Sequence, residues 1–340
     1  MADRSDLHPF PNGWYVFALS SELPKGKVLA RAFMGQDVTV FRTQSGQAHA
    51  VESYCPHLGA HFGHGGTVVG ETLQCPFHGF RFNGKGACVR TGYDTPAPPK
   101  AKLRTWHLRE QNGFLLIYHH VNGEAPDWQV PSVDEQDWTP LIYKSFVLND
   151  HPQETTENSV DVGHFSYVHN YQRPRETRAF EAKGHALSTG YAVLRSLNFL
   201  GFSLRRYDLF FDIQIFGLGY SIVNIRLPLF KVVARLWVLP TSIDENRIIL
   251  RLALRMKKWP TVLGDLASRL MGRYIFYNFV KDASQDFPIW ENKRFLRRPA
   301  LAQGDGPIGK YRHWAKQFYS PTECDAGKSN TELIADTMEM

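Results

Sequence analysis

The sequence predicts a small all-β domain followed by a larger α+β domain built on one broad antiparallel sheet. Three observations support this. Short β-type runs separated by turn signals fill the first third of the 340 residues. Longer β-type stretches fill 175–256, as in an antiparallel sheet. Residues 259–295 follow these strands with few breakers and predict a long helix.

The first domain is expected to consist of hairpins. Its runs end at the turn signals "MGQ", "QSG" and "QNG", and Gly84 and Gly86 are free to take positive φ in a further hairpin. We therefore expect an all-β domain over about 10–120, followed by a polar linker rich in Pro and Asp over 121–138. The predicted strand and hairpin segments are 27–33, 37–43, 47–53, 80–89 and 103–120.

The second domain is expected over 139–320. Residues 152–169 carry few breakers and predict a helix before the strands. The long helix over 259–295 is opened by Pro260 and interrupted near Pro288. The remaining segment, 321–340, is polar and is expected to be a mobile tail.

Composition indicates a soluble cytoplasmic protein. Hydrophobic residues make up 43% and charged residues 21% of the chain, as in ordinary globular proteins. The longest apolar runs are shorter than the ~20 residues that span a bilayer, so no transmembrane segment is expected. The net charge is +6, but the cations are dispersed, which argues against nucleic-acid binding. Four cysteines at irregular spacing do not suggest a disulfide framework.

A candidate metal site lies in the first domain. Its spacing is Cys55-x-His57, then 17 residues, then Cys75-x2-His78. Thiolates and imidazoles on two short loops suit zinc or an iron–sulfur cluster. A zinc finger usually takes two Cys from one loop and two His from the other, whereas here each loop supplies one of each. That arrangement is typical of a Rieske [2Fe–2S] cluster, and a zinc ribbon or accidental spacing is the alternative.

The stretch "CPHLGAHF…CPFHGFRF" resembles the Rieske family, and the resemblance covers the whole first domain. Respiratory-chain members of that family carry an extra cysteine in each loop, at the positions of Ala60 and Phe77 here. The resemblance therefore implies the oxygenase and ferredoxin branch, whose cluster relays single electrons. Cys88 and Cys324 have no assigned partner and are expected to be free thiols.

A second candidate site follows in "ENSVDVGHFSYVHN", which offers Asn158, Asp161, His164 and His169. With 14 histidines in the chain, ~0.6 pairs are expected at any chosen spacing, so this pattern alone is weak. Behind a Rieske domain, however, it resembles the mononuclear iron motif of Rieske oxygenases. That resemblance implies a facial triad of two imidazoles and one carboxylate on Fe(II), with positions open for O2.

The histidine spacing sets a geometric condition. On a regular helix, residues five apart differ by about 140° around the axis, so the helix must end or bulge between His164 and His169. The third ligand must come from elsewhere, and "KDASQDFPIWENK" offers Asp282, Asp286 and Glu291. Asp286 is our prediction because "QDFPIW" resembles the family's last-ligand segment. Asp282 is the fallback.

The resemblance also implies a role for Asp161. In the family, the matching Asp bridges a Rieske histidine of one chain to an iron-ligand histidine of the next. Asp161 would then link His78 of the partner subunit to His164, which implies a head-to-tail homotrimer. Asn158 is expected beside the iron ligands without binding the metal.

Among Rieske oxygenases, "SVDVGHFSYVHN", "QDFPIWENK", "GDGPI" and "RHWAKQFY" are similar to those that act on steroids, the 3-ketosteroid 9α-hydroxylase and cholesterol 7-desaturase group. This implies a helix-grip (START/Bet v1-like) catalytic domain, a sheet wrapped around a long helix, with an apolar cavity. The implied function is a terminal oxygenase component that hydroxylates, desaturates or demethylates a hydrophobic, steroid-like substrate. Two alternatives remain: an O-demethylase or hydroxylase of aromatic or alkaloid substrates, and a Rieske electron carrier without oxygenase activity.

The sequence contains no module for electron input. It has no G-x-G-x-x-G in a βαβ setting and no plant-type C-x4-C-x2-C run. We therefore expect a separate flavin-dependent reductase, with or without a ferredoxin, to deliver electrons from NAD(P)H. Each turnover then uses two electrons and O2.

Overall fold

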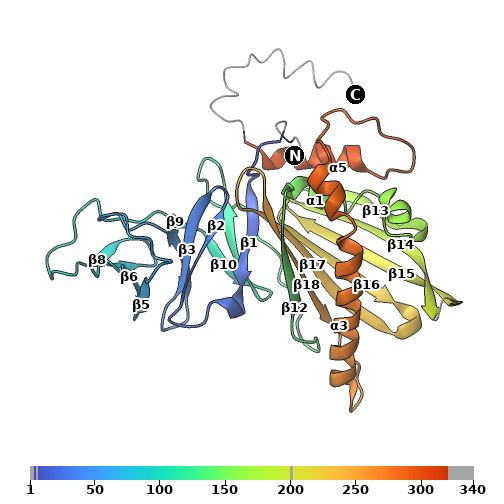
Figure 1. The fold of residues 1–340 in the computed structure, drawn as a ribbon, viewed down its shortest axis with the longest axis horizontal. Coiled ribbons are helices and arrows are strands. Elements are labelled where there is room, and N and C mark those ends of the chain that lie inside the picture. The colour runs from blue at the N-terminus through green and yellow to red at the C-terminus, as the bar shows by residue number, and fades with distance from the viewer. Residues whose placement is uncertain (1–3, 5–6, 200–201, 321–340) are drawn as a thin grey trace.

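The computed structural model describes Arg4 and residues 7–320, except 200–201. The predicted tail over 321–340, including Cys324, lies outside the described residues. The structure confirms the predicted fold class: an all-β domain is followed by an α+β domain with one large antiparallel sheet. The two domains lie side by side, with the first domain against one face of the large sheet (Figure 1).

The first domain consists of three small sheets with the strand orders β1-β11-β10, β2-β3-β4-β9 and β5-β6-β7-β8. The third sheet lies farthest from the second domain (Figure 1). At the turn between β10 and β11, Asn112 and Gly113 both have positive φ, +56° and +84°, as a type I′ hairpin turn requires. The strands are β1 (Gly13–Leu19), β2 (Val28–Phe33), β3 (Gln36–Arg42), β4 (Ala48–Glu52), β5 (Thr67–Val69), β6 (Thr72–Gln74), β7 (Arg81–Asn83), β8 (Cys88–Arg90), β9 (Thr105–Trp106), β10 (Leu108–Gln111) and β11 (Phe114–His119).

The second domain is built on a seven-stranded antiparallel sheet in the order β12-β18-β17-β16-β15-β14-β13. Alternate residues point to opposite faces of such a sheet. On one face Leu236, Leu250 and Leu254 pack in a core with Phe276 of the long helix α3 (Gly264–Ala283). Figure 1 shows α3 lying across this sheet. The strands are β12 (Ile142–Leu148), β13 (Gln172–Lys183), β14 (Ala186–Phe199), β15 (Phe202–Phe216), β16 (Tyr220–Leu227), β17 (Val232–Ser242) and β18 (Ile248–Met256).

The opposite face of this sheet holds the first domain. Trp14 and Val16 of β1 form a core with Trp237 and other residues of β16 and β17. Arg251 of β18 is buried there and donates to the carbonyl oxygens of Val16 and Phe17, at 2.8 and 2.7 Å. Burial lowers the pKa of Arg251 to about 10, so its guanidinium stays charged at neutral pH. A bulge in β1 between Val16 and Ala18 interrupts the ladder next to these carbonyls.

Two helix predictions were wrong in their extent. Residues 152–169 form two short helices, α1 (Pro152–Glu157) and α2 (His164–Tyr167), with an irregular segment between them. The stretch 259–295 forms α3 and α4 (Phe287–Asn292), which confirms the interruption predicted near Pro288, but α3 begins four residues after Pro260. The break lies before Pro288, because proline fits the first turn of a new helix, where its missing N–H is not needed. The last helix is α5 (Ile308–Ala315), and short 3-10 turns occur at Ser20–Glu22, Pro228–Phe230 and Lys316–Phe318.

Among the described residues, no helix is long and apolar enough to cross a membrane.

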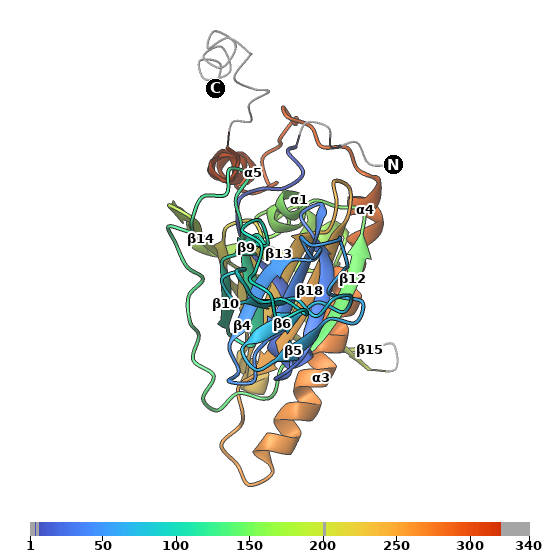
Figure 2. The same ribbon diagram turned by 90° about the vertical axis from the view of Figure 1, so that its left-hand side faces the viewer.

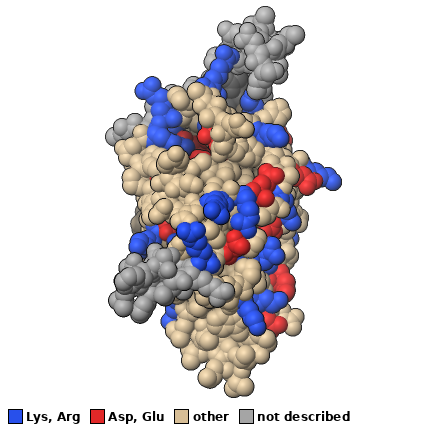
Figure 3. Space-filling model, turned by 90° about the vertical axis from the view of Figure 1, so that its right-hand side faces the viewer, with Lys and Arg blue, Asp and Glu red and all other residues tan. Residues whose placement is uncertain are grey.

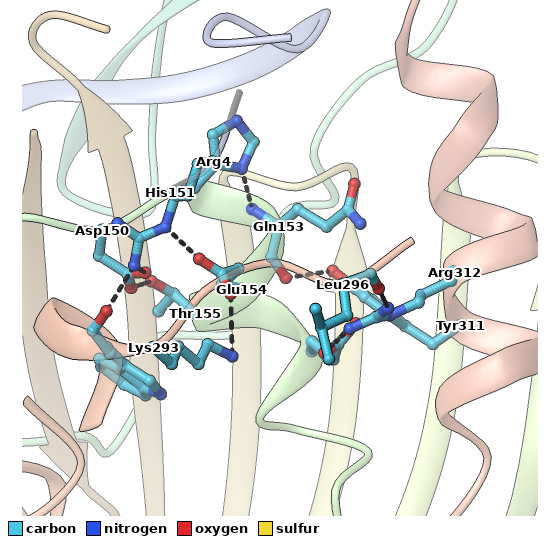
Figure 4. A network of polar contacts seen from close by, with 12 residues as sticks. Arg4, Asp150, His151, Gln153, Glu154, Thr155, Lys293, Leu296, Tyr311 and Arg312 are labelled. Atoms are coloured by element: carbon cyan, nitrogen blue, oxygen red, sulfur yellow. Dashed lines mark hydrogen bonds and ion pairs between the residues drawn. The ribbon is translucent and has the colours of Figure 1, made fainter. Parts of the chain in front are cut away.

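Helix α1 is buried although it carries two carboxylates. Glu154 forms an ion pair with Lys293 at 3.1 Å and accepts a hydrogen bond from the Nε atom of Arg4 (Figure 4). Glu157 binds Arg312 through two N–H groups, at 2.6 and 2.8 Å. Buried charges are tolerated only when they are paired in this way. These cations therefore fix the helix that leads into Asn158 and Asp161.

We expect Arg312→Ala to lower the free energy of unfolding by about 3 kcal/mol, because it leaves the Glu157 carboxylate buried without a partner. Urea unfolding monitored by circular dichroism measures this. The exposed pair Arg90–Asp94 supplies the control, since Arg90→Ala should leave the midpoint unchanged.

The double variant Arg312→Leu with Glu157→Leu should recover most of the loss, because it removes both charges at once. If the double variant is no more stable than Arg312→Ala, the pairing does not account for the effect.

Candidate metal centres

Two loops of the first domain carry the predicted cluster residues. Cys55 and His57 follow β4, and Cys75 and His78 lie between β6 and β7. The loops have the same backbone pattern: each cysteine N–H donates to the carbonyl five residues later, at 2.8 Å in both. The glycines four residues after each cysteine have φ of +74° and +68° and close the loops with an N–H bond to the cysteine carbonyl. The structure therefore brings the four predicted side chains to one end of the domain.

The side chains of these loops fit a [2Fe–2S] cluster. Cys55 and Cys75 are both 2% exposed and interact with each other, whereas the rings of His57 and His78 lie 4.8 Å apart and are partly exposed. The Nδ1 atom of His78 is buried and has no hydrogen-bond partner, which a metal ion would supply. Burial, together with the neighbouring Cys75 thiol, raises the pKa of Cys55 to about 12. A thiolate at this position therefore needs a bound cation to stabilise it.

In the second domain, the structure brings together His164, His169 and Asp286. One ligand atom from each lies within 4.8 Å of the other two. Helix α2 ends at Tyr167, so His169 lies beyond the helix and can face the same point as His164. This satisfies the condition set by the five-residue spacing. Asp286 is buried at the N-terminal end of α4, in the break between α3 and α4.

Hydrogen bonds orient both imidazoles toward the carboxylate. The Nδ1 atom of His164 lies 2.5 Å from the carbonyl oxygen of Asp161, and that of His169 lies 3.0 Å from Oε1 of Gln285. Because these oxygens can only accept, both Nδ1 atoms carry the hydrogen. This leaves the Nε2 atom of each ring with a lone pair that can bind a metal. Nε2 of His169 lies 3.4 Å from Oδ2 of Asp286.

The electrostatics of this group favour a bound cation. Burial would lower the pKa of His169, but the hydrogen bond and charge of Asp286 outweigh it and raise the pKa above its ordinary value. The carboxylate therefore attracts positive charge to the point between the rings. Two neutral imidazoles and one carboxylate form the donor set of a 2-His-1-carboxylate facial triad, so the residues present fit Fe(II).

Asn158 and Asp161 lie next to this group. The Nδ2 atom of Asn158 is 3.2 Å from both His164 Nε2 and Asp286 Oδ2. Oδ1 of Asp161 accepts the backbone N–H of His164 at 3.2 Å, and one third of its side chain is exposed. Burial would raise the pKa of Asp161, but its hydrogen bonds with His164 and the charge of that ring lower it below the ordinary value. Asp161 is therefore an anion at neutral pH.

The other carboxylates offered by the sequence have different partners. Asp282 accepts hydrogen bonds from the hydroxyl of Tyr171 at 2.8 Å and from Arg195 at 3.1 Å. Glu291 accepts the backbone N–H of Asn149. Neither belongs to the group formed by the histidines, so Asp286 is the one of these three carboxylates that joins them.

Sequence reasoning missed Gln285, Tyr171 and Arg195. Gln285 directly precedes Asp286, and Tyr171 follows His169 by two residues, so their positions beside predicted ligands were a usable signal. Arg195 lies on β14 and carried no such signal. Together, Asp282 and these partners connect the strand after His169 to the end of α3.

The surroundings of the histidines are aromatic. The rings of Phe165, Tyr171 and Phe211 contact one another, and Phe165 also contacts Tyr191. His164 lies 4.7 Å from the Phe165 ring centroid, and His169 lies 5.3 Å from that of Tyr171. These rings form an aromatic wall beside the histidines, and such a surface suits contact with an apolar ligand.

Comparison with known protein families gives one match for each of the two domains. Residues 13–106 match the family described as "Rieske [2Fe-2S] domain". Residues 117–319 match "3-Ketosteroid 9alpha-hydroxylase C-terminal domain", which is more than half of the chain.

Relatives match along nearly the whole chain. The chain is 31% identical to "Cholesterol 7-desaturase nvd 1" of Ciona intestinalis, over 93% of this chain and 70% of that protein. It is 27% identical to "3-ketosteroid-9-alpha-monooxygenase, oxygenase component" of Rhodococcus rhodochrous, over 92% of this chain and 81% of that protein.

Solved structures share the fold at low sequence identity. Dicamba monooxygenase bound to dicamba has a TM-score of 0.65 at 17% identity, covering 91% of this chain and 97% of that chain. NdmA QL mutant of Pseudomonas putida CBB5 with theobromine has a TM-score of 0.69 at 17% identity, covering 89% of each chain. Together with the family matches and the relatives, these findings show that the chain belongs to the Rieske non-heme iron oxygenases with a catalytic domain of the 3-ketosteroid 9α-hydroxylase type.

Proposed function

We propose that the protein is the terminal oxygenase component of a monooxygenase or desaturase that acts on a steroid-like, fused-ring lipid. One observation supports this above all. Two histidines whose Nδ1 atoms are hydrogen-bonded elsewhere present Nε2 beside a buried carboxylate, in a domain that follows the cysteine and histidine loops of a Rieske domain. An electron carrier would not need this second donor set, so the geometry favours an oxygenase over a Rieske ferredoxin.

Cys55, His57, Cys75 and His78 would hold the [2Fe–2S] cluster, and His164, His169 and Asp286 would hold the mononuclear iron. When bound, these groups supply one-electron transfer and the activation of O2. Asp161 and Gln285 keep the imidazoles in the tautomer that presents Nε2. Asn158 contributes an amide beside the ligands, where it can hydrogen-bond to a ligand oxygen or to bound solvent.

Electron transfer between the two centres requires a second copy of the chain in this proposal. The sheet that carries the cluster loops lies farthest from the second domain, and α3 packs on the face of the large sheet opposite to the first domain (Figure 1). Asp161 is anionic and partly exposed beside His164, so its carboxylate is available to hydrogen-bond His78 of the partner subunit. Leu58 and Phe77 flank the cluster histidines and are largely exposed, which suits a docking surface. A head-to-tail trimer joins these two surfaces in a closed ring.

Reducing equivalents would come from a separate flavin-dependent reductase, with or without a ferredoxin, and ultimately from NAD(P)H. The Rhodococcus relative is itself named an oxygenase component, which implies a further component in that system. Cys88, the described cysteine that is not assigned to the cluster, carries a free thiol. Free thiols suit a reducing compartment, and we place the protein in the cytoplasm as part of this proposal.

The substrate assignment rests on the relatives and on the aromatic wall. The relatives are named for cholesterol and for 3-ketosteroids. Phe165 and Phe211 supply apolar surface beside the histidines. Each Å2 of a fused-ring skeleton that this surface removes from water contributes ~25 cal/mol to the free energy of binding. Dicamba monooxygenase and NdmA share the fold alone at 17% identity. O-demethylation or hydroxylation of an aromatic or alkaloid substrate, the alternative left open by the sequence, is the second candidate.

Removing one ligand from each centre should separate the two metals. His164→Ala should lose the mononuclear iron and all turnover but keep the visible and EPR signals of the cluster. His57→Ala should lose the cluster signals while the second site still binds iron.

Metal analysis of the loaded wild type should give about three irons per chain, two of them with acid-labile sulfide. Two irons in fully loaded protein would instead indicate an electron carrier.

Asp286 and Asp282 form a matched pair of carboxylates four residues apart. Asp286→Asn should lose the mononuclear iron, because the amide replaces the anionic ligand. Asp282→Asn should keep the iron and lower turnover about tenfold, because its contacts with Tyr171 and Arg195 position the segment without binding metal. Iron content and kcat distinguish the variants. Retention of iron in Asp286→Asn and its loss in Asp282→Asn would reverse the ligand assignment.

Asp161→Asn should slow electron transfer from the reduced cluster to the second site by about 10–100-fold. Both metals should remain bound, since Asp161 contributes its carboxylate to neither donor set and its backbone carbonyl still orients His164. Single-turnover oxidation of the reduced cluster in the presence of substrate and O2 measures the rate. An unchanged rate with intact metals would exclude Asp161 from the path.

A substrate panel tests the function as a whole. Steroids with a 3-keto or 3-hydroxy group, benzoates and small methoxyarenes are incubated with the protein and a surrogate reductase, and O2 uptake and product mass are recorded. We expect uptake with the steroids alone. Gain of one oxygen atom means hydroxylation, and loss of two hydrogen atoms means desaturation. Turnover of the small arenes without steroid turnover would overturn the lipid assignment and support the second candidate.

A further inference from the structure

Helix α3 has apolar residues on two opposite faces. Ser268, Gly272 and Phe276 lie on the face buried against the sheet. A second set, at spacings of four, four and three residues, falls within an arc of about 80° on the other side of the helix. An amphipathic surface helix normally has a single apolar face, so the second one requires a separate explanation. We call this set the α3 stripe: Leu266, Leu270, Tyr274 and Tyr277.

The α3 stripe is exposed along its length. Each of its four side chains is more than half exposed, from 56% for Leu270 to 69% for Tyr277. It continues at the start of the helix into Leu263 and the fully exposed Val262. Figures 1 and 2 both show this end of α3 extending below the sheet, and Figure 3 shows that the lower end of the molecule carries few charged side chains on that side. A contiguous apolar surface on a projecting end marks an interaction site.

Cations border the α3 stripe. Residues 257–273 contain four cations and a single carboxylate, Asp265. Asp265 is already paired with Lys258 at 3.1 Å and with Arg269 at 2.8 Å. Lys257 and Arg273 are exposed. Asp137 of the preceding segment is also exposed and lies beside Lys258, whose backbone N–H donates to its carbonyl oxygen, so four cations and two carboxylates lie in this region. The surface therefore combines apolar side chains with a net positive charge around them.

We propose that the α3 stripe docks the protein on the surface of an anionic lipid bilayer. A projecting, convex apolar end with tyrosines and flanking cations suits insertion into the headgroup region, where each Lys or Arg near the surface adds to binding. The net positive charge disfavours pairing of this surface with the same surface of a second copy. The inference rests on the proposed function in one respect: a fused-ring lipid resides in bilayers, so docking brings the enzyme to its substrate.

Vesicle co-sedimentation of the full-length, metal-loaded protein tests this without substrate or turnover, so its outcome is independent of the proposed activity. We expect binding to vesicles of phosphatidylcholine mixed with phosphatidylglycerol and weaker binding to phosphatidylcholine alone. Leu266→Asp with Leu270→Asp should lower binding at least about tenfold. Lys257→Gln and Arg273→Gln should each lower it about fivefold on the anionic vesicles alone.

Leu296→Asp with Leu301→Asp is the matched control, because these leucines are similarly exposed and lie outside the α3 stripe. It should bind vesicles as the wild type does. Three results would overturn the proposal: no sedimentation of the wild type with either vesicle, equal sedimentation of the stripe variant, or a change in assembly mass without a change in vesicle binding. The last would assign the α3 stripe to a contact between protein chains. Circular dichroism and the visible cluster spectrum confirm that each variant is folded.

Discussion

The candidate iron site depends on two interruptions in helical structure. His164 and His169 face one point because α2 ends between them, and Asp286 joins them because α3 stops before α4 begins. A continuous helix through either segment would turn these ligands away from one another. Asp286 occupies the break itself, with Pro288 in the first turn of the new helix, where proline is preferred. The contact of Tyr171 with Asp282 then holds one broken segment against the other.

Buried ion pairs on α1, next to the site, hold the first of these breaks in place. The irregular segment with Asn158 and Asp161 is continuous with α1, whose Glu154 and Glu157 are buried. Their partners come from distant parts of the chain: Arg4 near the N-terminus, Lys293 after α4, and Arg312 on α5. Each pair is costly to break because the remaining charge is left without solvent. The geometry of the metal ligands is thereby linked to the correct docking of both ends of the chain.

Much of this arrangement was predictable because it is local in the sequence. Turn signals such as "QNG" predicted hairpins, and the spacing of Cys and His in the first domain indicated a Rieske cluster. The second donor set was predicted from the resemblance to Rieske oxygenases, and the five-residue spacing of His164 and His169 required a helix to end or bulge between them. The extent of the helices was not predictable, because "PQETTENSV" has the composition of an exposed helix and its burial depends on cations more than a hundred residues away. The contact of Arg195 with Asp282 was not predictable either, because the two residues lie 87 positions apart in the chain.

Helix α3 connects the candidate iron site to the outer surface of the molecule. Its last turn carries Asp282, next to the break that holds Asp286, and its first turns carry the apolar end that projects from the sheet. Twenty residues of helix separate these ends by about 30 Å. Between them, Phe276, Phe279 and Val280 face the core rather than solvent. If the projecting end lies in a bilayer, the packing of these side chains against the sheet sets how the catalytic domain is oriented on it. One helix would then serve as the wall of the catalytic domain and as its attachment to the phase where the substrate dissolves.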